Sequence, residues 1–364
     1  MIKNISFVLA FITLLSCNNN KAQSQEIDSA KGLKDYYADY FPIGVSVSPQ
    51  ELKGDEAKLI VNQFNSITAV NAMKMGLLQP KENEFYWKDA DSIVAFARRH
   101  DLKLRGHTLV WHQQTPDWFF TDANGKQVTK EVLLKRIKDH ITAVVGRYKD
   151  DICAWDVVNE AIADAKDTMY RNSKFYQICG EEYIAKAFEW AHAADPDAIL
   201  FYNDYNEINP VKRAKIISLI KKLKAAGVPV HAVGLQAHWT LEEPSKDELE
   251  KTLKEFLSLN LPLQITELDV SVYTQEQTKQ HEKKEKQPDI HFTSEKENKQ
   301  LQQYKMIFDL FRKYKTSITG VTFWNVSDKK SWLDNFPVKN RKDHPLLFDE
   351  NLKPKKAFWK VVQF

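Results

Sequence analysis

The chain has 364 residues, of which 43% are hydrophobic, 28% charged and 12% aromatic. This composition excludes a disordered chain, a collagen-like repeat and a small disulfide scaffold, and the length allows one large α/β barrel or two smaller domains. The 52 lysine and arginine residues nearly balance the 49 aspartate and glutamate residues, so charge favours neither nucleic acid nor an anionic surface, and we expect a neutral partner.

The N-terminus predicts a targeting segment rather than part of the fold. A short start containing Lys3 precedes an apolar run from Ile5 to Leu15, which is too short to span a bilayer as a helix and is typical of a secretory signal. The run ends in Leu-Leu-Ser-Cys and resembles a bacterial lipobox, in which Cys17 would carry the lipid; an ordinary signal peptide is the alternative. We therefore expect a lipoprotein signal peptide over 1–16 and a flexible tether over 17–32. The protein is then a secreted lipoprotein, periplasmic or anchored to the outer membrane of a Gram-negative bacterium, and it meets the membrane only through the lipid.

From residue 33 onward, short apolar runs alternate with longer amphipathic segments, and helical periods such as 130–137 and 211–220 fill the intervals. Eight strand-and-helix pairs in series are typical of a single (β/α)8 TIM barrel of the α/β class, to which we assign residues 33–364. An open doubly wound sheet is the alternative, but no glycine-rich phosphate loop follows the first strand. The predicted strands are 41–47, 66–72, 103–111, 152–159, 198–204, 231–238, 263–270 and 318–325.

One segment interrupts this alternation. Residues 273–300 follow the seventh predicted strand and are polar and highly charged. We expect a solvated surface insertion there, and a lid that contacts substrate is the alternative.

Two cysteines remain after Cys17. An oxidising compartment permits a disulfide between Cys153 and Cys179. Two buried free thiols are the alternative, and the sequence supplies no distance that would decide between them.

Two of the predicted strands end in glutamates. Functional side chains of a TIM barrel lie where strands end and the following loops begin, because the barrel interior is packed. Glu160 ends the fourth strand and Glu267 lies near the end of the seventh, so the two are expected to face each other across the barrel mouth. Hydrolysis of a glycosidic bond requires such a pair, one carboxyl group to protonate the leaving oxygen and one to attack the sugar or activate water. A surface or salt-bridged position is the alternative for each glutamate taken singly.

The residues around these glutamates resemble the motifs of glycoside hydrolase family 10, the retaining endo-β-1,4-xylanases with a TIM barrel. Residues 155–160, WDVVNE, resemble the acid/base motif of the family, and residues 265–269, ITELD, resemble its nucleophile motif. Six motifs occur in the order of the family and cover roughly residues 35–364. The other four are 105–112 (RGHTLVWH), 202–206 (YNDYN), 233–239 (VGLQAHW), and the TFW, SD and SWL elements within 322–333.

The resemblance implies a role for each catalytic position. Glu160 corresponds to the general acid/base and Glu267 to the nucleophile. Carboxyl groups of a retaining pair stand about 5 to 5.5 Å apart, so an ionised Glu267 favours the protonated form of Glu160 until the glycosyl ester forms. His238 and Asp269 are expected to form a hydrogen-bonded chain to Glu267. Asn159 is expected to bond the sugar 2-hydroxyl, a contact that strengthens in the transition state.

A groove for xylan needs aromatic planes for the apolar sugar faces and polar donors for the hydroxyls. Part of the aromatic excess is therefore expected at the barrel mouth, and the four tryptophans Trp87, Trp118, Trp190 and Trp359 are expected to be structural. Tyr205 and His112 are secondary candidates for the pocket. The positions that match the glycone side of the family are Asn71, Lys74, His107, Trp111, Gln236, Trp324 and Trp332.

Three positions depart from the family pattern. Val70 stands where the family usually has Glu, Met75 where it has an aromatic residue, and Asn325 where it often has Gly. Valine cannot accept a hydrogen bond from a sugar hydroxyl, so a contact worth about 1 kcal/mol is expected to be missing. Asn325 is expected to crowd the loop at Trp324. These departures predict an altered substrate preference at the subsites on the glycone side.

The prediction is therefore a monomeric endo-1,4-β-xylanase that acts on xylan or xylooligosaccharides and needs no cofactor, metal or nucleic acid. A β-1,4-glucanase or mixed-linkage glucanase is the alternative within hydrolases, and a non-catalytic surface glycan-binding protein is the alternative outside enzymes. A metal-dependent barrel hydrolase is disfavoured, because the ten histidines include no His-x-His pair after the first strand and no HExxH run.

Overall fold

The computed structural model of the chain describes residues 31–273 and 292–364. The predicted signal peptide, Cys17 and the tether up to residue 30 lie outside these residues, as does most of the predicted insertion. The first described helix, α1, begins at Leu33 with Gly32 as its N-cap.

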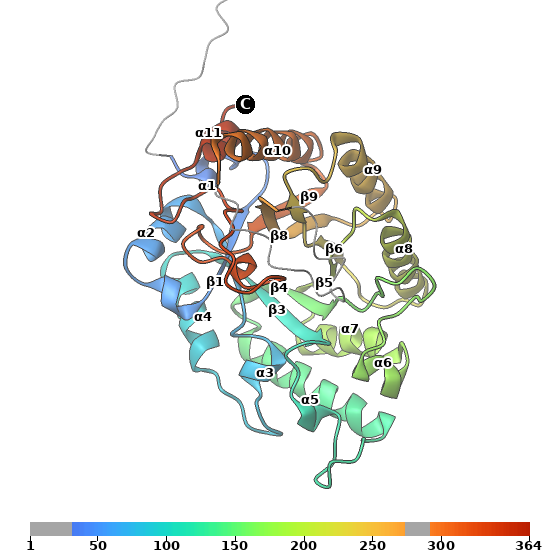
Figure 1. Cartoon of the computed structure of the whole chain (residues 1–364). Helices are drawn as coiled ribbons and strands as arrows, with labels where there is room; N and C mark the ends of the chain where they lie inside the picture. Colours follow the sequence, from blue (N-terminus) through green and yellow to red (C-terminus); the bar gives the residue numbers. More distant parts are fainter. Residues whose placement is uncertain (1–30, 274–291) are drawn as a thin grey trace, which may run out of the picture.

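Nine parallel strands of the described residues close into a barrel of eight positions, because β6 and β7 share one position, and the longer helices form a ring around it (Figure 1). From β1 to β6 each strand pairs with the next, β6 and β7 both pair with β8, and β9 pairs with β8 and β1 to close the ring. The predicted (β/α)8 barrel is confirmed. The strands are β1 (Ile43–Val47), β2 (Ser66–Ala69), β3 (Lys103–Trp111), β4 (Ile152–Asn159), β5 (Ile199–Asp204), β6 (Ala232–Leu235), β7 (His238–Thr240), β8 (Leu263–Ser271) and β9 (Ile318–Phe323).

The strands read as nearly continuous apolar runs because helices cover the outer face of the sheet and side chains fill its inside. All five residues of β1 are buried. The indole of Trp155 packs directly on Gly106 of the adjacent strand, where an added Cβ would lie 2.1 Å from the ring. Glycine at this position is therefore required by the packing of a tryptophan from the adjacent strand.

The sixth predicted strand is interrupted. It was expected to run over 231–238, but β6 ends at Leu235 and a short β7 begins at His238. Ala237 between them has a φ of 61°, a left-handed conformation that takes a residue out of a sheet ladder. As a result His238 pairs with Asp269 on β8.

The second and eighth strands are shorter than expected. β2 ends at Ala69, and residues 70–74 turn across the barrel mouth instead of extending the strand. β9 ends at Phe323, after which Trp324 donates its backbone N–H to Leu268. Both differences place predicted sugar-binding residues on loops at the carboxyl ends of strands.

Side chains cap the starts of several of the longer helices. Thr129 accepts a hydrogen bond from the backbone of Val132 at the start of α5, and Ser245 forms a capping box with Glu248 at the start of α9. The helices are α1 (Leu33–Tyr36), α2 (Gly54–Gln63), α3 (Met75–Leu78), α4 (Lys88–Arg99), α5 (Lys130–Tyr148), α6 (Lys174–Cys179), α7 (Glu182–Ala194), α8 (Pro210–Ala225), α9 (Lys246–Leu257), α10 (Ser294–Lys313) and α11 (Lys356–Val362).

The predicted insertion ends earlier than residue 300. Helix α10 already begins at Ser294, because Thr293 caps it by accepting a hydrogen bond from the backbone of Lys296. Residues 274–291 of this segment lie outside the described residues.

The two ends of the barrel chain meet. In Figure 1 the blue α1 and the red α11 lie side by side, and the Tyr37 hydroxyl donates a hydrogen bond of 2.7 Å to the carbonyl of Val361. Arg312 of α10 donates to the same hydroxyl. These contacts close the helical ring.

Two further sequence questions are answered within residues 31–273 and 292–364. Cys153 is exposed and Cys179 is buried, and both are free thiols, so the possible disulfide between them is absent and only one of the two thiols is buried. None of the helices in this part of the chain is long and apolar enough to cross a membrane.

Candidate active site

A cavity of about 300 Å³ opens at the carboxyl ends of the barrel strands. It brings together Glu160, Glu267 and all the predicted glycone-side residues, although they come from six different strands or the loops that follow them. Its lining residues are Val70, Asn71, Lys74, His107, Trp111, Gln113, Gln114, Asn159, Glu160, Tyr205, Gln236, His238, Glu267, Trp324, Trp332 and Phe336.

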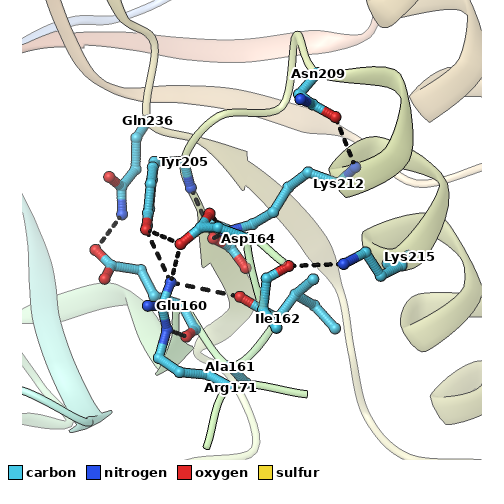
Figure 2. Close-up of polar contacts among 12 residues, drawn as sticks. Glu160, Ala161, Ile162, Asp164, Arg171, Tyr205, Asn209, Lys212, Lys215 and Gln236 are labelled. Carbon is cyan, nitrogen blue, oxygen red and sulfur yellow. Dashed lines mark hydrogen bonds and ion pairs between the residues drawn. The ribbon is translucent and has the colours of Figure 1, made fainter. Parts of the chain in front are cut away.

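Glu160 directly follows the last residue of β4. Its backbone has a φ of 58°, and its N–H donates to the carbonyl of Asn203 on β5. The carboxylate accepts hydrogen bonds from Trp111 Nε1 at 2.9 Å and from Gln236 Nε2 at 3.0 Å (Figure 2 shows the second contact). Neighbouring Asn159 also donates to it, at 3.2 Å. Three donors therefore hold the Glu160 carboxyl group in one orientation.

Glu267 lies on β8 and is 4% exposed. Its Oε2 atom is 3.3 Å from Nε2 of His238, whose Nδ1 lies 2.9 Å from Asp269. Burial lowers the pKa of His238, but the charge and hydrogen bond of Asp269, followed by the contact with Glu267, outweigh burial and raise it to about 10. His238 is therefore an imidazolium at neutral pH that donates to a carboxylate on each side.

The same contacts keep Glu267 ionised. Burial raises the pKa of Glu267, but the hydrogen bond from His238, the electrostatic contributions of His107 and His238, and the hydrogen bond from Asn203 outweigh burial and lower it to about 2. A buried carboxylate that stays anionic without a direct solvent shell is suited to act as a nucleophile.

Asn203 joins the two glutamates. Its amide nitrogen donates to Glu267 at 2.8 Å and to the Asn159 oxygen at 2.9 Å, while its oxygen accepts from Thr266 at 2.7 Å. Because Asn159 in turn donates to Glu160, one chain of side-chain amides connects both carboxyl groups. The sequence analysis quoted Asn203 within a motif but did not assign it to the site; its place at the end of β5 was the available signal.

Lys74, Asn71 and Trp111 form one wall of the cavity. The ammonium of Lys74 donates to Asn71 at 3.0 Å and lies 4.6 Å from the centre of the Trp111 ring. Burial lowers the pKa of Lys74 to about 8, although the charges of Glu267 and Glu160 oppose this. Trp111 was predicted as a sugar platform, and the structure adds that its indole N–H is a donor to Glu160.

A buried carboxylate, that of Asp156, orients His107. Its Nδ1 lies 2.8 Å from Asp156, and the other oxygen of Asp156 pairs with Arg105. The ring of Trp324 stands edge-on to His107 at 5.2 Å. These contacts direct the remaining nitrogen of His107 toward the cavity.

Trp332 is the second tryptophan of the mouth. Its Nε1 donates to Asp269 at 2.8 Å, its ring lies 4.8 Å from that of His238, and Phe336 stacks on it at 5.2 Å. Asp269 thus anchors both His238 and Trp332. Three further lining residues were not predicted: Gln113 and Gln114, which closely follow the end of β3, and Phe336, which lies far beyond the end of β9.

The two secondary candidates for the pocket, Tyr205 and His112, lie in different places. Tyr205 lines the cavity, whereas His112 stands behind it with Nδ1 3.9 Å from Glu160. Burial, together with the charges of Arg171 and Lys212, lowers the pKa of His112 to about 3, so this imidazole is neutral at neutral pH. The four tryptophans expected to be structural are partly buried against the core.

The three departures from the family pattern differ in their consequences. Val70 lines the cavity, but Met75 is 2% exposed and does not line it. Asn325 directly follows Trp324, in the loop that it was expected to crowd. It adopts a φ of 95°, and its side-chain oxygen accepts the backbone N–H of Trp332 at 3.0 Å, so it supports the turn that carries this tryptophan.

Two other features of the described residues do not compete with this cavity. A wider depression of about 700 Å³ lies between α8 and α9, but aliphatic and charged side chains line it and no aromatic ring does. Among the described residues, no group of three or more His, Cys, Asp or Glu side chains could hold a metal ion. The strand-end cavity is therefore the candidate active site.

Comparison with known proteins identifies the family of the chain. The family model described as glycosyl hydrolase family 10 matches residues 32–364. Endo-1,4-beta-xylanase B of Paenibacillus barcinonensis is 47% identical over 327 residues, which cover 90% of this chain and 96% of that protein. A beta-1,4-xylanase of Dictyoglomus thermophilum is 45% identical over 360 residues, or 99% of this chain and 96% of that one. The crystal structure of xylanase XynB from Paenibacillus barcinonensis complexed with a conduramine derivative superimposes with a TM-score of 0.87 at 46% identity, over 93% of this chain and 99% of that one.

Proposed function

This chain belongs to glycosyl hydrolase family 10 and is a glycoside hydrolase, and on that premise we propose that it is an endo-1,4-β-xylanase that cleaves internal linkages of xylan with net retention. The observation that carries the proposal is the pair Glu160 and Glu267 in one cavity, joined through Asn159 and Asn203. The identity of about 45% to xylanases over most of the chain supports the substrate class.

In the first step Glu267 attacks the anomeric carbon while Glu160 gives its proton to the leaving glycosidic oxygen. The C–O bond to the leaving chain breaks and an ester bond to Glu267 forms. His238, charged and hydrogen-bonded to Glu267, keeps the nucleophile ionised and oriented before the attack.

In the second step the ester has removed the charge of Glu267, so Glu160 can act as a base toward water. Water attacks the anomeric carbon, its proton goes to Glu160, and the ester bond breaks to restore Glu267. Two displacements give a product of the original configuration.

The lining of the cavity supports a neutral sugar chain as substrate. Trp111, Trp324 and Trp332 supply aromatic surface, and His107 and Lys74 supply donors for hydroxyl groups. Asn159 uses one N–H on Glu160, which leaves its second N–H for the sugar 2-hydroxyl in the proposed complex.

An NMR time course of product anomers tests the activity and the stereochemistry together. On glucuronoxylan and arabinoxylan the first-formed reducing ends are expected to be β and to mutarotate later. α anomers at early times would refute retention. Faster release of reducing ends from carboxymethylcellulose than from xylan would refute the substrate class.

Variants separate the enzyme from a glycan-binding protein. Glu160→Ala and Glu267→Ala are expected to abolish hydrolysis of xylan but retain binding of xylohexaose in calorimetry, because the tryptophan surface stays intact. A wild type that binds xylan and releases no reducing ends would contradict the proposed activity.

We further propose that the chain is anchored to a membrane through Cys17. The support is the apolar run that ends in Leu-Leu-Ser-Cys. In a Gram-negative host the wild type is expected in the detergent-extracted membrane fraction and Cys17→Ser in the soluble fraction. Equal distribution of the two forms would contradict the anchor.

A further inference from the structure

Arg171 stands at the end of the loop that follows β4 and reaches back to the start of that loop. Its Nε donates to the backbone carbonyl of Glu160 at 2.9 Å, and its Nη2 donates to the hydroxyl of Tyr205 at 2.9 Å and to Asp164 at 3.1 Å (Figure 2). One planar guanidinium therefore contacts the main chain of one cavity residue and the side chain of another.

The backbone that Arg171 holds is unusual. Glu160 has a φ of 58°, a region that residues other than glycine, asparagine and aspartate rarely adopt. Its N–H is held by Asn203, and the next two N–H groups, of Ala161 and Ile162, donate to the hydroxyl of Tyr202 at 3.1 and 3.2 Å. Arg171 supplies the contact to the Glu160 carbonyl, so it helps to hold the turn that aims the Glu160 side chain.

The partners of Arg171 are themselves fixed. Lys212 is 1% exposed, pairs with Asp164 at 2.8 Å and lies 4.0 Å from the centre of the Tyr205 ring. The Tyr205 hydroxyl donates to Asp164. Lys215 donates to three carbonyl groups of the same loop, those of Ala163, Ala165 and Thr168. The ring of Tyr205, which lines the cavity, is thereby tied to the Glu160 backbone through a single arginine.

We propose that Arg171 is a positioning residue for acid catalysis: it holds the left-handed turn at Glu160 and the Tyr205 ring in register, so that the proton of Glu160 is aligned with the leaving glycosidic oxygen. The inference rests on the proposed role of Glu160. Arg171 does not line the cavity, and it acts through Glu160 and Tyr205 rather than on the substrate.

The leaving group provides the readout. A misplacement of about 1 Å can reduce a rate about 10²-fold. The loss is expected only where the leaving group needs a proton. Phenol is a poor leaving group and requires an acid, whereas 2,4-dinitrophenolate departs without one. The ratio of kcat/KM on phenyl and 2,4-dinitrophenyl β-xylobioside therefore measures the alignment of Glu160 separately from substrate binding, because both substrates place the same sugars in the cavity.

Arg171→Gln is expected to lose about 10²-fold in kcat/KM on the phenyl substrate but less than about threefold on the dinitrophenyl substrate. Arg171→Lys is expected to behave similarly, because a single ammonium cannot reproduce the fork that bonds Glu160 and Tyr205 together. Equal losses on the two substrates, or full activity of Arg171→Lys, would overturn the proposal.

Arg136 offers a matched control. It is as buried as Arg171, with side chains 13% and 19% exposed, and it likewise donates to loop carbonyls, those of Trp118, Phe119 and Thr121, outside the cavity. Arg136→Gln is expected to keep the wild-type ratio of the two substrates. The same change of ratio in Arg136→Gln would refute a specific role of Arg171.

Glu160→Gln, measured in parallel, separates the two proposals. It is expected to show the strongest dependence on the leaving group. If Glu160→Gln shows none, the acid role of Glu160 is wrong; if it shows the dependence and Arg171→Gln does not, only the role of Arg171 is wrong.

Discussion

The charge of His238 controls the ionisation of Glu267, and its removal is the most direct perturbation of the site. His238→Gln takes away the cation between Asp269 and Glu267 and retains an amide that can donate to one of them. Burial, which raises the pKa of Glu267, is then opposed by fewer contacts that lower it. The pKa of Glu267 is expected to rise from about 2 to at least its ordinary 4.5.

The size of the effect follows from the pKa values. The difference between 4.5 and about 2 for Glu267 corresponds to roughly 3 kcal/mol, and the difference between 6.5 and about 10 for His238 to roughly 5 kcal/mol. Both figures describe one contact network and are not added. Removal of one member of a buried charge pair costs about 3–5 kcal/mol, so the free energy of unfolding of His238→Gln is expected to fall by that amount.

The dependence on pH has a defined sign. The lowered pKa of Glu267 stabilises the fold above pH 4.5, and this contribution is lost as the pH falls from 4.5 to about 2. The raised pKa of His238 stabilises the fold below pH 6.5, and that contribution is lost as the pH rises from 6.5 to about 10. Chemical unfolding of the wild type between pH 6.5 and 10 is expected to show this decline, and His238→Gln is expected to lack it.

The acid limb of kcat/KM reports the ionisation of the free enzyme. With xylohexaose as substrate, the wild type is expected to show no acid limb attributable to Glu267 between pH 4 and 7, and His238→Gln is expected to show one at pH 4.5 or above. His140→Gln is the control, because His140 is a buried imidazole whose pKa is lowered by burial to about 3 and whose Nδ1 contacts Gln79 rather than a carboxylate. A pH profile of His238→Gln that is unchanged from the wild type would refute the reasoning. So would an acid limb in His140→Gln like that expected for His238→Gln.

Three further changes test the network and the departures from the family pattern. Asn203→Ala removes the amide that joins Glu267 to Asn159 and is expected to lower kcat/KM on xylan about 10²-fold, with little change in the affinity for xylohexaose in calorimetry. Val70→Glu restores an acceptor at the cavity wall and is expected to improve KM for linear xylooligosaccharides about fivefold, equivalent to about 1 kcal/mol; an unchanged KM would contradict the missing contact. Asn325→Ala and Asn325→Gly both lose the hydrogen bond to Trp332, but only alanine also strains the φ of 95°. Asn325→Ala is therefore expected to be about 1 kcal/mol less stable than Asn325→Gly in thermal unfolding, and equal stabilities would contradict the assigned strain.

The pattern of apolar residues predicts much of the fold. The bounds predicted for the third and fourth strands coincide with β3 and β4, because a strand buried on both faces is a continuous apolar run between polar helix surfaces. The errors lie where a single residue changes the backbone. Ala237 in a left-handed conformation divides the sixth strand, and Thr293 starts α10 inside a segment whose polar composition suggested a loop.

The meeting of Glu160 and Glu267 at the barrel mouth was also accessible from the sequence, because the carboxyl-terminal parts of parallel strands lie on one face of a barrel. The family resemblance implied an ionised Glu267 with His238 and Asp269 beside it, but the full set of contacts that lowers the pKa of Glu267 is seen only in the fold. Glu267 takes its hydrogen bonds from Asn203, 64 residues away in the chain, and from His238, 29 residues away. No local pattern encodes such contacts, and the pKa of a buried carboxyl depends on them more than on its own type. The hydrogen bond from Arg171 to Tyr205 likewise joins residues that are 34 positions apart in the chain. Sequence periodicity assigns residues to a barrel and to its mouth. Only the tertiary packing decides which side chains hold the catalytic pair in place and in which ionisation state.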